Sequence, residues 1–194
     1  NSEVVRGKVI LSDRFSESAR TIHELQKKGA KVVVLAHQGS PKSDDFISLK
    51  QHAKLLNKFV KIRFVDDVVG KKALSEIGEL KYGEALLLDN VRFVKDEMNP
   101  FVDNELVRKL VSFFDVYIND AFSVCHRNHT SVVSFPKVLF SVVGRVMERE
   151  LKTLEKLDLR NALFILGGMK NEGNLKVALR AKRILATGLF GALV

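Results

Sequence analysis

The chain has 194 residues, of which 46% are hydrophobic and 28% are charged, as is typical of a globular protein. No apolar run approaches the roughly 20 residues that a membrane-spanning helix needs, so we expect no membrane association. The single cysteine, Cys125, excludes an internal disulfide and favours a reducing compartment, here expected to be the cytoplasm. The net charge of +9 indicates attraction to anions.

The first half of the chain alternates apolar runs with amphipathic segments. In chain order these predict a strand at 8–11, a helix at 16–28, a strand at 31–36, a helix at 48–57, a strand at 61–65, a helix at 71–79 and a strand at 85–88. Gly29 is well placed to end the first helix, and Ser48 is a candidate cap for the second. The continuous apolar run at 31–36 is typical of a strand buried on both faces of a parallel sheet.

The second half continues the alternation. It predicts a loop at 95–100, a helix at 104–114, a strand at 116–118, a mixed segment at 132–143, a helix at 144–157, a strand at 162–166, a helix at 175–183 and a strand at 184–187. Alternating strands and helices favour right-handed βαβ units, and therefore an α/β fold with a doubly wound, Rossmann-like parallel sheet. A domain boundary is expected after the long helix. It gives a domain at 1–157 and the beginning of a second at 158–194.

Polar side chains follow most of the predicted strands. In open parallel sheets ligands bind beyond the carboxyl ends of the strands, where the loops converge. The side chains expected at this rim are Asp13, Arg14, His37, Gln38, Asp66, Asp67, Asn90, Arg92, Asn119, Asp120, His126, Arg127, His129 and Lys170. Three of them are arginines, and a guanidinium group binds carboxylate or phosphate through two parallel hydrogen bonds. The pattern therefore predicts a site for a multiply charged anion.

Each of these residues also has a simpler interpretation. An arginine after a strand is more often a surface residue, and the loop at 119–131 could be a polar loop without function. Lys170 follows Gly167 and Gly168, so it is either a solvated lysine or a lysine that reaches a phosphate held by the glycine loop. The Walker A spacing is absent, and no spacing suggests a zinc site. Cys125 has no recognisable base beside it and is predicted to be a small buried residue.

Six stretches together identify a family. They read GAKVVVLAHQG at 29–39, FVDD at 64–67, GEALLLDNVRF at 83–93, NDAF through HR at 119–127, MEREL at 147–151 and LGGMK at 166–170. In these stretches, which span nearly the whole chain, the sequence resembles phosphoglycerate kinase, most closely its archaeal branch.

The resemblance implies an enzyme of two Rossmann-like domains joined by a helix. The first domain would bind 3-phosphoglycerate or 1,3-bisphosphoglycerate, and the second would bind ATP or ADP with Mg²⁺. The implied reaction is reversible phosphoryl transfer between 1,3-bisphosphoglycerate with ADP and 3-phosphoglycerate with ATP, in glycolysis and gluconeogenesis. Such transfer needs in-line positioning and positive charge around the moving group. A monomer is expected.

Residue roles follow from matching positions only. The resemblance implies substrate contacts from Asn1, Arg14, His37, Gln38, Gly39, Ser40, Arg92 and Arg127. It implies supporting positive charge from His126 and His129, and nucleotide contacts from Gly167, Gly168 and Lys170. Arg14 and Lys170 would be the catalytic residues, because both would contact the transferred phosphoryl group.

Three departures from the family pattern leave an alternative open. Ser40 stands where the family has an arginine of the basic patch, and Asn174 stands where it has a second lysine. The family has about twice this length. We therefore expect the first core strand, the adenine pocket and the acidic Mg²⁺ ligand to lie outside this chain, which would be inactive alone. The alternative is a non-catalytic relative that binds a sugar phosphate. Nucleic-acid binding rests on the net charge alone, since no recognition motif supports it.

Overall fold

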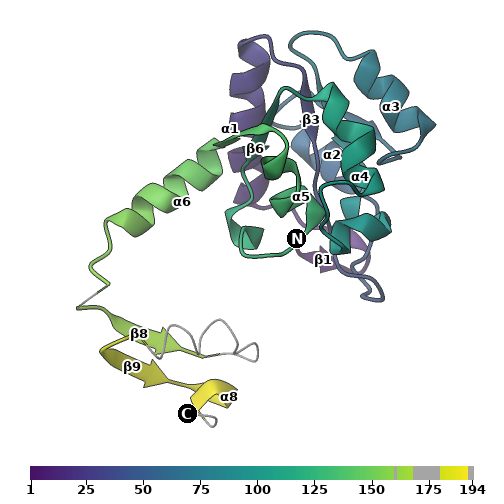
Figure 1. Ribbon diagram of the computed structural model, residues 1–194. Coiled ribbons are helices and arrows are strands. Elements are labelled where there is room, and N and C mark those ends of the chain that lie inside the picture. Colours follow the sequence, from purple (N-terminus) through teal and green to yellow (C-terminus); the bar gives the residue numbers. More distant parts are fainter. Residues whose placement is uncertain (160, 168–179, 192–194) are drawn as a thin grey trace. The chain divides into compact units, whose positions relative to one another are not determined.

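The computed structural model describes residues 1–159, 161–167 and 180–191 (Figure 1). The chain divides into two compact units, Asn1–Arg149 and Glu150–Val194. The division falls inside helix α6 (Arg145–Glu155), whereas the sequence predicts a boundary just beyond the end of that helix. None of the described helices is long and apolar enough to cross a membrane.

A three-stranded parallel sheet with the order β3-β5-β4 forms the centre of the first unit. Its strands are β3 (Val32–Val34), β4 (Arg63–Val65) and β5 (Ala85–Leu88). Parallel neighbours need crossover connections, and helices α2 (Lys50–Leu56) and α3 (Lys71–Gly78) lie in those connections. The predicted α/β class with parallel strands is confirmed.

Strand β5 is the middle strand, and its four side chains are all buried. Successive side chains of a strand point to opposite faces, and β5 therefore contributes to two separate cores. Leu86 and Leu88 pack in one core with residues of α3 and of α4 (Glu105–Leu110), while Ala85 and Leu87 pack in the other with residues of α1 (Asp13–Lys27) and α2. Helices cover both faces of the sheet, as a doubly wound fold requires (Figure 1).

A second parallel pair, β6 (Val116–Asn119) and β7 (Phe140–Val143), belongs to the same unit. Among the described strands, β3 pairs only with β5, and β6 only with β7. The sequence did not predict β7, because its four residues are all exposed and show no alternation. The segment before it contains the short helix α5 (Thr130–Val133) and a 3-10 turn that carries Pro136 near its start.

Several helix ends differ from the prediction for local reasons. Helix α1 begins at Asp13, three residues early, and Gly29 follows its end with a φ of 80°, which glycine adopts without strain. The cap position of α2 is Leu49, one residue after Ser48, and its amide donates a 2.8 Å hydrogen bond to Oδ1 of Asp89. Oγ of Ser48 still accepts a 3.3 Å hydrogen bond from the amide of Lys50, the first residue of the helix. Asn104, by contrast, caps α4 by accepting a 3.0 Å hydrogen bond from the amide of Val107.

Shorter elements complete the unit. The 3-10 turns are η1 (Val91–Phe93), η2 (Lys95–Met98), η3 (Val111–Phe113), η4 (Phe122–Val124) and η5 (Phe135–Lys137). Turn η2 lies where the sequence predicts an irregular loop, and it buries Glu97. The strand predicted at 8–11 is the two-residue β2 (Lys8–Val9), which pairs antiparallel with β1 (Val4–Val5) outside the parallel sheet.

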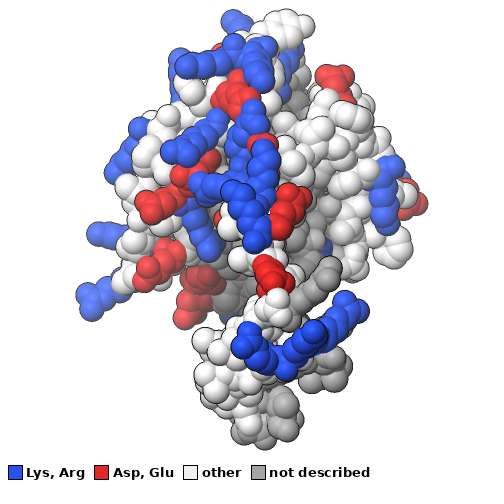
Figure 2. All heavy atoms as spheres, turned by 90° about the vertical axis from the view of Figure 1, so that its left-hand side faces the viewer, with Lys and Arg blue, Asp and Glu red and all other residues white. Residues whose placement is uncertain are grey.

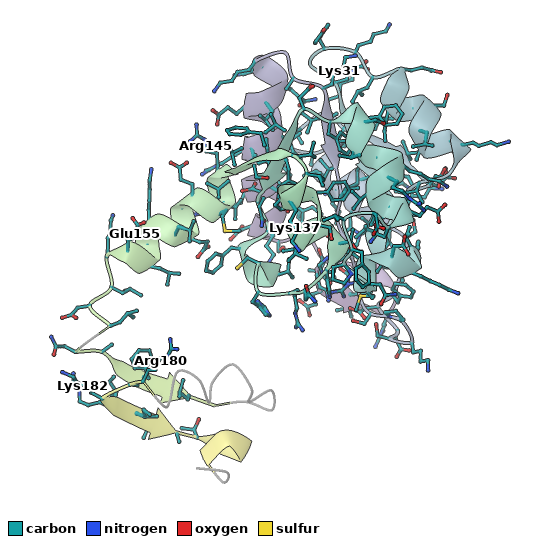
Figure 3. All side chains as sticks on the ribbon, in the orientation of Figure 1. Lys31, Lys137, Arg145, Glu155, Arg180 and Lys182 are labelled. Carbon is teal, nitrogen blue, oxygen red and sulfur yellow. The ribbon has the colours of Figure 1, made fainter. Side chains whose placement is uncertain are left out.

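The first turn of α6 is tied to the first unit by named contacts. Asp120, just after β6, accepts hydrogen bonds from the amides of Val146 and Met147 at 2.8 and 3.1 Å, and so caps α6. Arg145, labelled in Figure 3, pairs with Glu24 of α1 at 2.6 Å. On this side of the molecule Lys and Arg side chains are interspersed with Asp and Glu (Figure 2). Such mixing is typical of a solvated surface.

The second unit contains a parallel pair, β8 (Leu163–Leu166) and β9 (Arg183–Ala186), followed by α8 (Gly188–Gly191). The strands predicted at 162–166 and 184–187 are present. Most of the helix predicted at 175–183 lies outside the described residues, but Arg183 belongs to β9 and is not helical. Parallel strands such as β8 and β9 need a long crossover connection.

Candidate anion-binding site

The loops that follow β3 and β5 meet at one edge of the sheet. Because the two strands are parallel and in register, their carboxyl ends lie side by side. Two hydrogen bonds join the loops directly: the amide of Val91 donates to the carbonyl of Ala36 at 3.0 Å, and Nδ2 of Asn90 donates to the carbonyl of Gln38 at 2.7 Å. The predicted rim therefore exists at these two strand ends.

Asn90 is the residue that fixes the shape of this rim. Its side chain is fully buried, donates to the carbonyls of Gln38 and Ile47, and accepts from the amide of Arg92 at 3.2 Å. These bonds join the loop after β3, the segment before α2 and turn η1. A buried amide that lost them would leave several unpaired polar groups, so the three segments are held in one arrangement.

Arg92 extends from turn η1 toward the loop after β3. Its Nη1 atom donates hydrogen bonds to the carbonyl of Gly39 and, at 3.2 Å, to Oγ of Ser40. Its Nε atom is buried and has no hydrogen-bond partner among the described residues. Ser40 is exposed, and its hydroxyl lies where the side chain of Arg92 ends.

Asn1 and Arg14 reach the same rim from the start of the chain. Nη1 of the exposed Arg14, in the first turn of α1, donates a 3.1 Å hydrogen bond to the carbonyl of Asn1. Gln38 is fully buried and exchanges hydrogen bonds with both backbone groups of Ser2, at 2.7 and 3.1 Å. We therefore expect Gln38 to stabilise the rim by connecting it to the start of the chain, rather than to contact a ligand.

The loop between β6 and α5 adds the remaining charges. Arg127 and His126 are exposed, whereas His129 is buried and stands at the cap position of α5. Cys125 is exposed, so the prediction that it is a small buried residue is wrong. None of the residues of turn η4 in this loop is buried. The sequence pattern of the loop did not indicate which of its side chains face solvent.

The pKa shifts indicate that these charges lie within reach of one another. The pKa of His37 is lowered to about 3 by burial first and then by positive charges that include Arg92, His129 and Arg127. The pKa of His129 is lowered by burial and by Arg92, Arg127 and His126. Burial likewise lowers the pKa of Arg92. A bound anion would relieve this mutual repulsion.

Sequence reasoning missed two acidic residues of this region. Asp45 accepts a 2.9 Å hydrogen bond from Nε2 of Gln38, and Glu97 lies fully buried in turn η2. Both raise the pKa of Arg92, so both face its guanidinium group. An isolated acidic residue in a predicted loop gives no sequence signal of burial, because the groups that bury it come from distant segments.

The predicted nucleotide-binding residues fall largely outside the described part of the chain. Gly167 directly follows β8, and a Cβ atom on it would lie 2.5 Å from Oγ1 of Thr187, so the close approach of β8 and the end of β9 favours glycine. Gly168 and Lys170 lie outside the described residues, as does Asn174. Within the described ranges, no group of three His, Cys, Asp or Glu residues is placed to hold a metal ion.

The first unit is a doubly wound α/β domain with basic side chains at the carboxyl ends of its parallel strands, which is where proteins of this class bind their ligands. Residues 1–189 match the sequence model of the phosphoglycerate kinase family, and the chain belongs to that family. It is 43% identical to the phosphoglycerate kinase of Sulfurisphaera tokodaii and 40% identical to that of Methanopyrus kandleri, with all of this chain and 51% of each relative covered.

Structural comparison agrees with the sequence match. The crystal structure of phosphoglycerate kinase from Pyrococcus horikoshii OT3 matches with a TM-score of 0.85 and 33% identity, covering 98% of this chain and 51% of that chain. The phosphoglycerate kinase of Coxiella burnetii, at 23% identity and a TM-score of 0.74, shares the fold. The chain thus spans about half the length of the relatives that it matches.

Proposed function

We propose that this chain is the substrate-binding part of a phosphoglycerate kinase, which transfers a phosphoryl group reversibly between ATP and 3-phosphoglycerate. The observation that supports it most is the convergence of Arg92 and Arg127 on His37 and His129 beyond the sheet, where the two arginines lower the pKa of both imidazoles. Family membership supports the substrate class proposed for this anion site, a three-carbon acid with one or two phosphoryl groups.

The residues of the rim suggest a division of labour. The guanidinium groups of Arg14 and Arg127 are exposed and would bind the carboxylate and phosphate oxygens. Arg92 is anchored by Gly39 and Ser40 and would contribute a fixed positive charge. His37 and His129 lie deeper and would add hydrogen bonds to the same oxygens. Positive charge held in place lowers the barrier to phosphoryl transfer without covalent participation of the protein.

The nucleotide and its metal would be held by the second unit. We propose that MgATP or MgADP binds near the glycine loop that begins at Gly167, with Lys170 reaching the transferred phosphoryl group. The described residues contain no cluster that fits Mg²⁺, so no step through the metal is assigned to them. The proposal further places the protein in the cytoplasm and treats it as a monomer.

Titration calorimetry with 3-phosphoglycerate tests the substrate site. Arg14→Ala and Arg127→Ala should each weaken binding by about 10- to 100-fold, since a charge-assisted hydrogen bond contributes roughly 1.5–3 kcal/mol. Lys31→Ala is the matched control, because Lys31 precedes β3 at the end of the strand away from His37 (Figure 3). Unchanged affinity in both arginine variants would contradict the proposal.

A non-catalytic sugar-phosphate-binding relative is the second candidate, and Ser40 favours it. The exposed Ser40 hydroxyl occupies a position where the family resemblance implies an arginine, so the rim has one positive charge fewer. A natural protein containing this chain that binds 3-phosphoglycerate but transfers no phosphoryl group from ATP would support the binding role. Measurable transfer of a phosphoryl group, monitored by the formation of ADP, would exclude the non-catalytic alternative.

A further inference from the structure

Glu97 is a fully buried carboxylate beneath a surface of positive charge. Its Oε2 atom accepts a 2.9 Å hydrogen bond from the amide of Ser131, and its Oε1 atom accepts one of 2.6 Å from the Ser131 hydroxyl. Burial raises the pKa of Glu97, while the bonds from Ser131 and the charge of Arg92 act in the opposite direction. A carboxylate this deeply buried is costly unless other groups compensate its charge.

The imidazole of His129 would provide such a group in its protonated form. Its Nδ1 atom lies 3.7 Å from Oε1 of Glu97, a distance that allows an ion pair but is too long for a hydrogen bond. His129 is itself buried, and the charges of Arg92, Arg127 and His126 lower its pKa together with burial. In the absence of an anion, the surrounding positive charges therefore favour the neutral imidazole.

An anion bound at the rim would instead favour the protonated imidazole of His129. The titratable and charged groups that face the Glu97–His129 pair are Arg92 from η1, His126 and Arg127 from the loop before α5, Tyr117 from β6, and His37 from the loop after β3, which is neutral because its pKa is about 3. Three of these can be cationic, so a phosphate or carboxylate bound among them would offset their charge. The imidazole would then gain a proton between two anions, the ligand above it and Glu97 below.

We propose that Glu97 is a positioning residue for the substrate site: its buried carboxylate acts through His129 by stabilising the imidazolium that forms when an anionic substrate binds. The proposal rests on the proposed function and adds a residue that does not touch the substrate. The competing, purely structural role is that Glu97 only anchors Ser131 at the start of α5. The two roles differ in their dependence on the charge of Glu97 and on the proton of His129.

NMR titration of the histidine side chains in the 194-residue chain separates the two roles. Addition of 3-phosphoglycerate should raise the titration midpoint of His129, whose signal is assigned by its loss in His129→Asn. In Glu97→Gln, which keeps the shape but loses the charge, this rise should largely disappear. Affinity for 3-phosphoglycerate should fall by about tenfold at pH 6, where the imidazolium forms readily, and by less at pH 8.

Two further variants control for folding and for simple loss of a hydrogen bond. Ser131→Ala removes the hydroxyl bond to Glu97 but leaves the charge, so His129 should titrate as in the unsubstituted chain. Glu97→Asp keeps the charge and should restore part of the rise if Glu97→Gln folds poorly. In the His129→Asn background, Glu97→Gln should cause no additional loss of affinity.

The possible failures are distinguishable. If the unsubstituted chain does not bind 3-phosphoglycerate, or if Arg127→Ala binds it normally, the proposed function fails. If binding requires Arg127 but Glu97→Gln leaves both the His129 midpoint and the affinity unchanged, or matches Ser131→Ala in both, only the role of Glu97 is overturned.

Discussion

The hydroxyl of Thr21, in the middle of α1, donates a 2.6 Å hydrogen bond to Oδ2 of Asp120, which lies 99 residues further along the chain. The other carboxylate oxygen of Asp120 accepts the amides of Val146 and Met147. One side chain therefore connects the first helix, the end of β6 and the first turn of α6. The helix that leaves the first unit is capped by a residue next to the candidate site.

Replacement of Asp120 by alanine should destabilise the first unit by about 1–2 kcal/mol, the usual effect of losing a helix cap. Thr21 and two helix amides lose their partner at the same time, which favours the upper part of that range. Urea unfolding monitored by circular dichroism measures the change. Ser141→Ala in the exposed strand β7 is the control and should stay within about 0.5 kcal/mol. Equal stability of the two variants would contradict the capping role.

Gly39→Ala should reduce both stability and anion binding. Gly39 has a φ of 66°, and an added Cβ atom would lie 2.5 Å from backbone atoms of Asp45 and Phe46, so the loop must move. We expect a loss of about 1–3 kcal/mol in the free energy of unfolding. Because the Gly39 carbonyl accepts a hydrogen bond from Arg92, affinity for 3-phosphoglycerate should fall as well. Gly83→Ala is a fair comparison, since φ is 79° there but an added Cβ atom would lie at an ordinary 3.4 Å from the carbonyl oxygen of Gln26. It should affect stability alone.

Stability should fall as the pH is lowered from about 6.5 toward 4. Burial lowers the pKa of His37 to about 3 and that of His52 to about 4, from an ordinary value of 6.5, so the unfolded chain binds protons that the folded chain does not. Each group then contributes a loss of at most about 1.4 kcal/mol per pH unit. Glu97, whose pKa is raised, acts in the opposite direction. Urea unfolding of His37→Asn should show a shallower pH dependence than that of the unsubstituted chain.

The parts of the fold that follow from local patterns could be predicted. The apolar run at 85–88 became the central strand β5, because a strand covered on both faces needs no polar side chains. The similar run around Val33 became β3, but its residues are only partly buried, since β3 has one partner among the described strands. Strand β7 was missed because its exposed side chains carry no periodic signal.

The charged residues of the candidate site could be predicted from the sequence, but the buried residues beneath them could not. His37 directly follows an apolar run, Arg92 and Arg127 lie in the loops after two others, and the rule that ligands bind at the carboxyl ends of parallel strands brings them together. Glu97 is buried by contact with Ser131, 34 residues away in sequence, and no local pattern contains that information. Cys125 was assigned to the interior because small apolar residues usually lie there, whereas the turn of its loop exposes it.

The rim is shaped by neutral hydrogen bonds, because Asn90 joins three segments through backbone groups and carries no charge. Dissolved salt weakens interactions between exposed charges but has little effect on buried, uncharged contacts. The shape of the rim and its electrostatic attraction for an anion therefore respond differently to salt. Ionic strength can tune how strongly the rim draws an anion from solution while the arrangement that receives the anion stays the same.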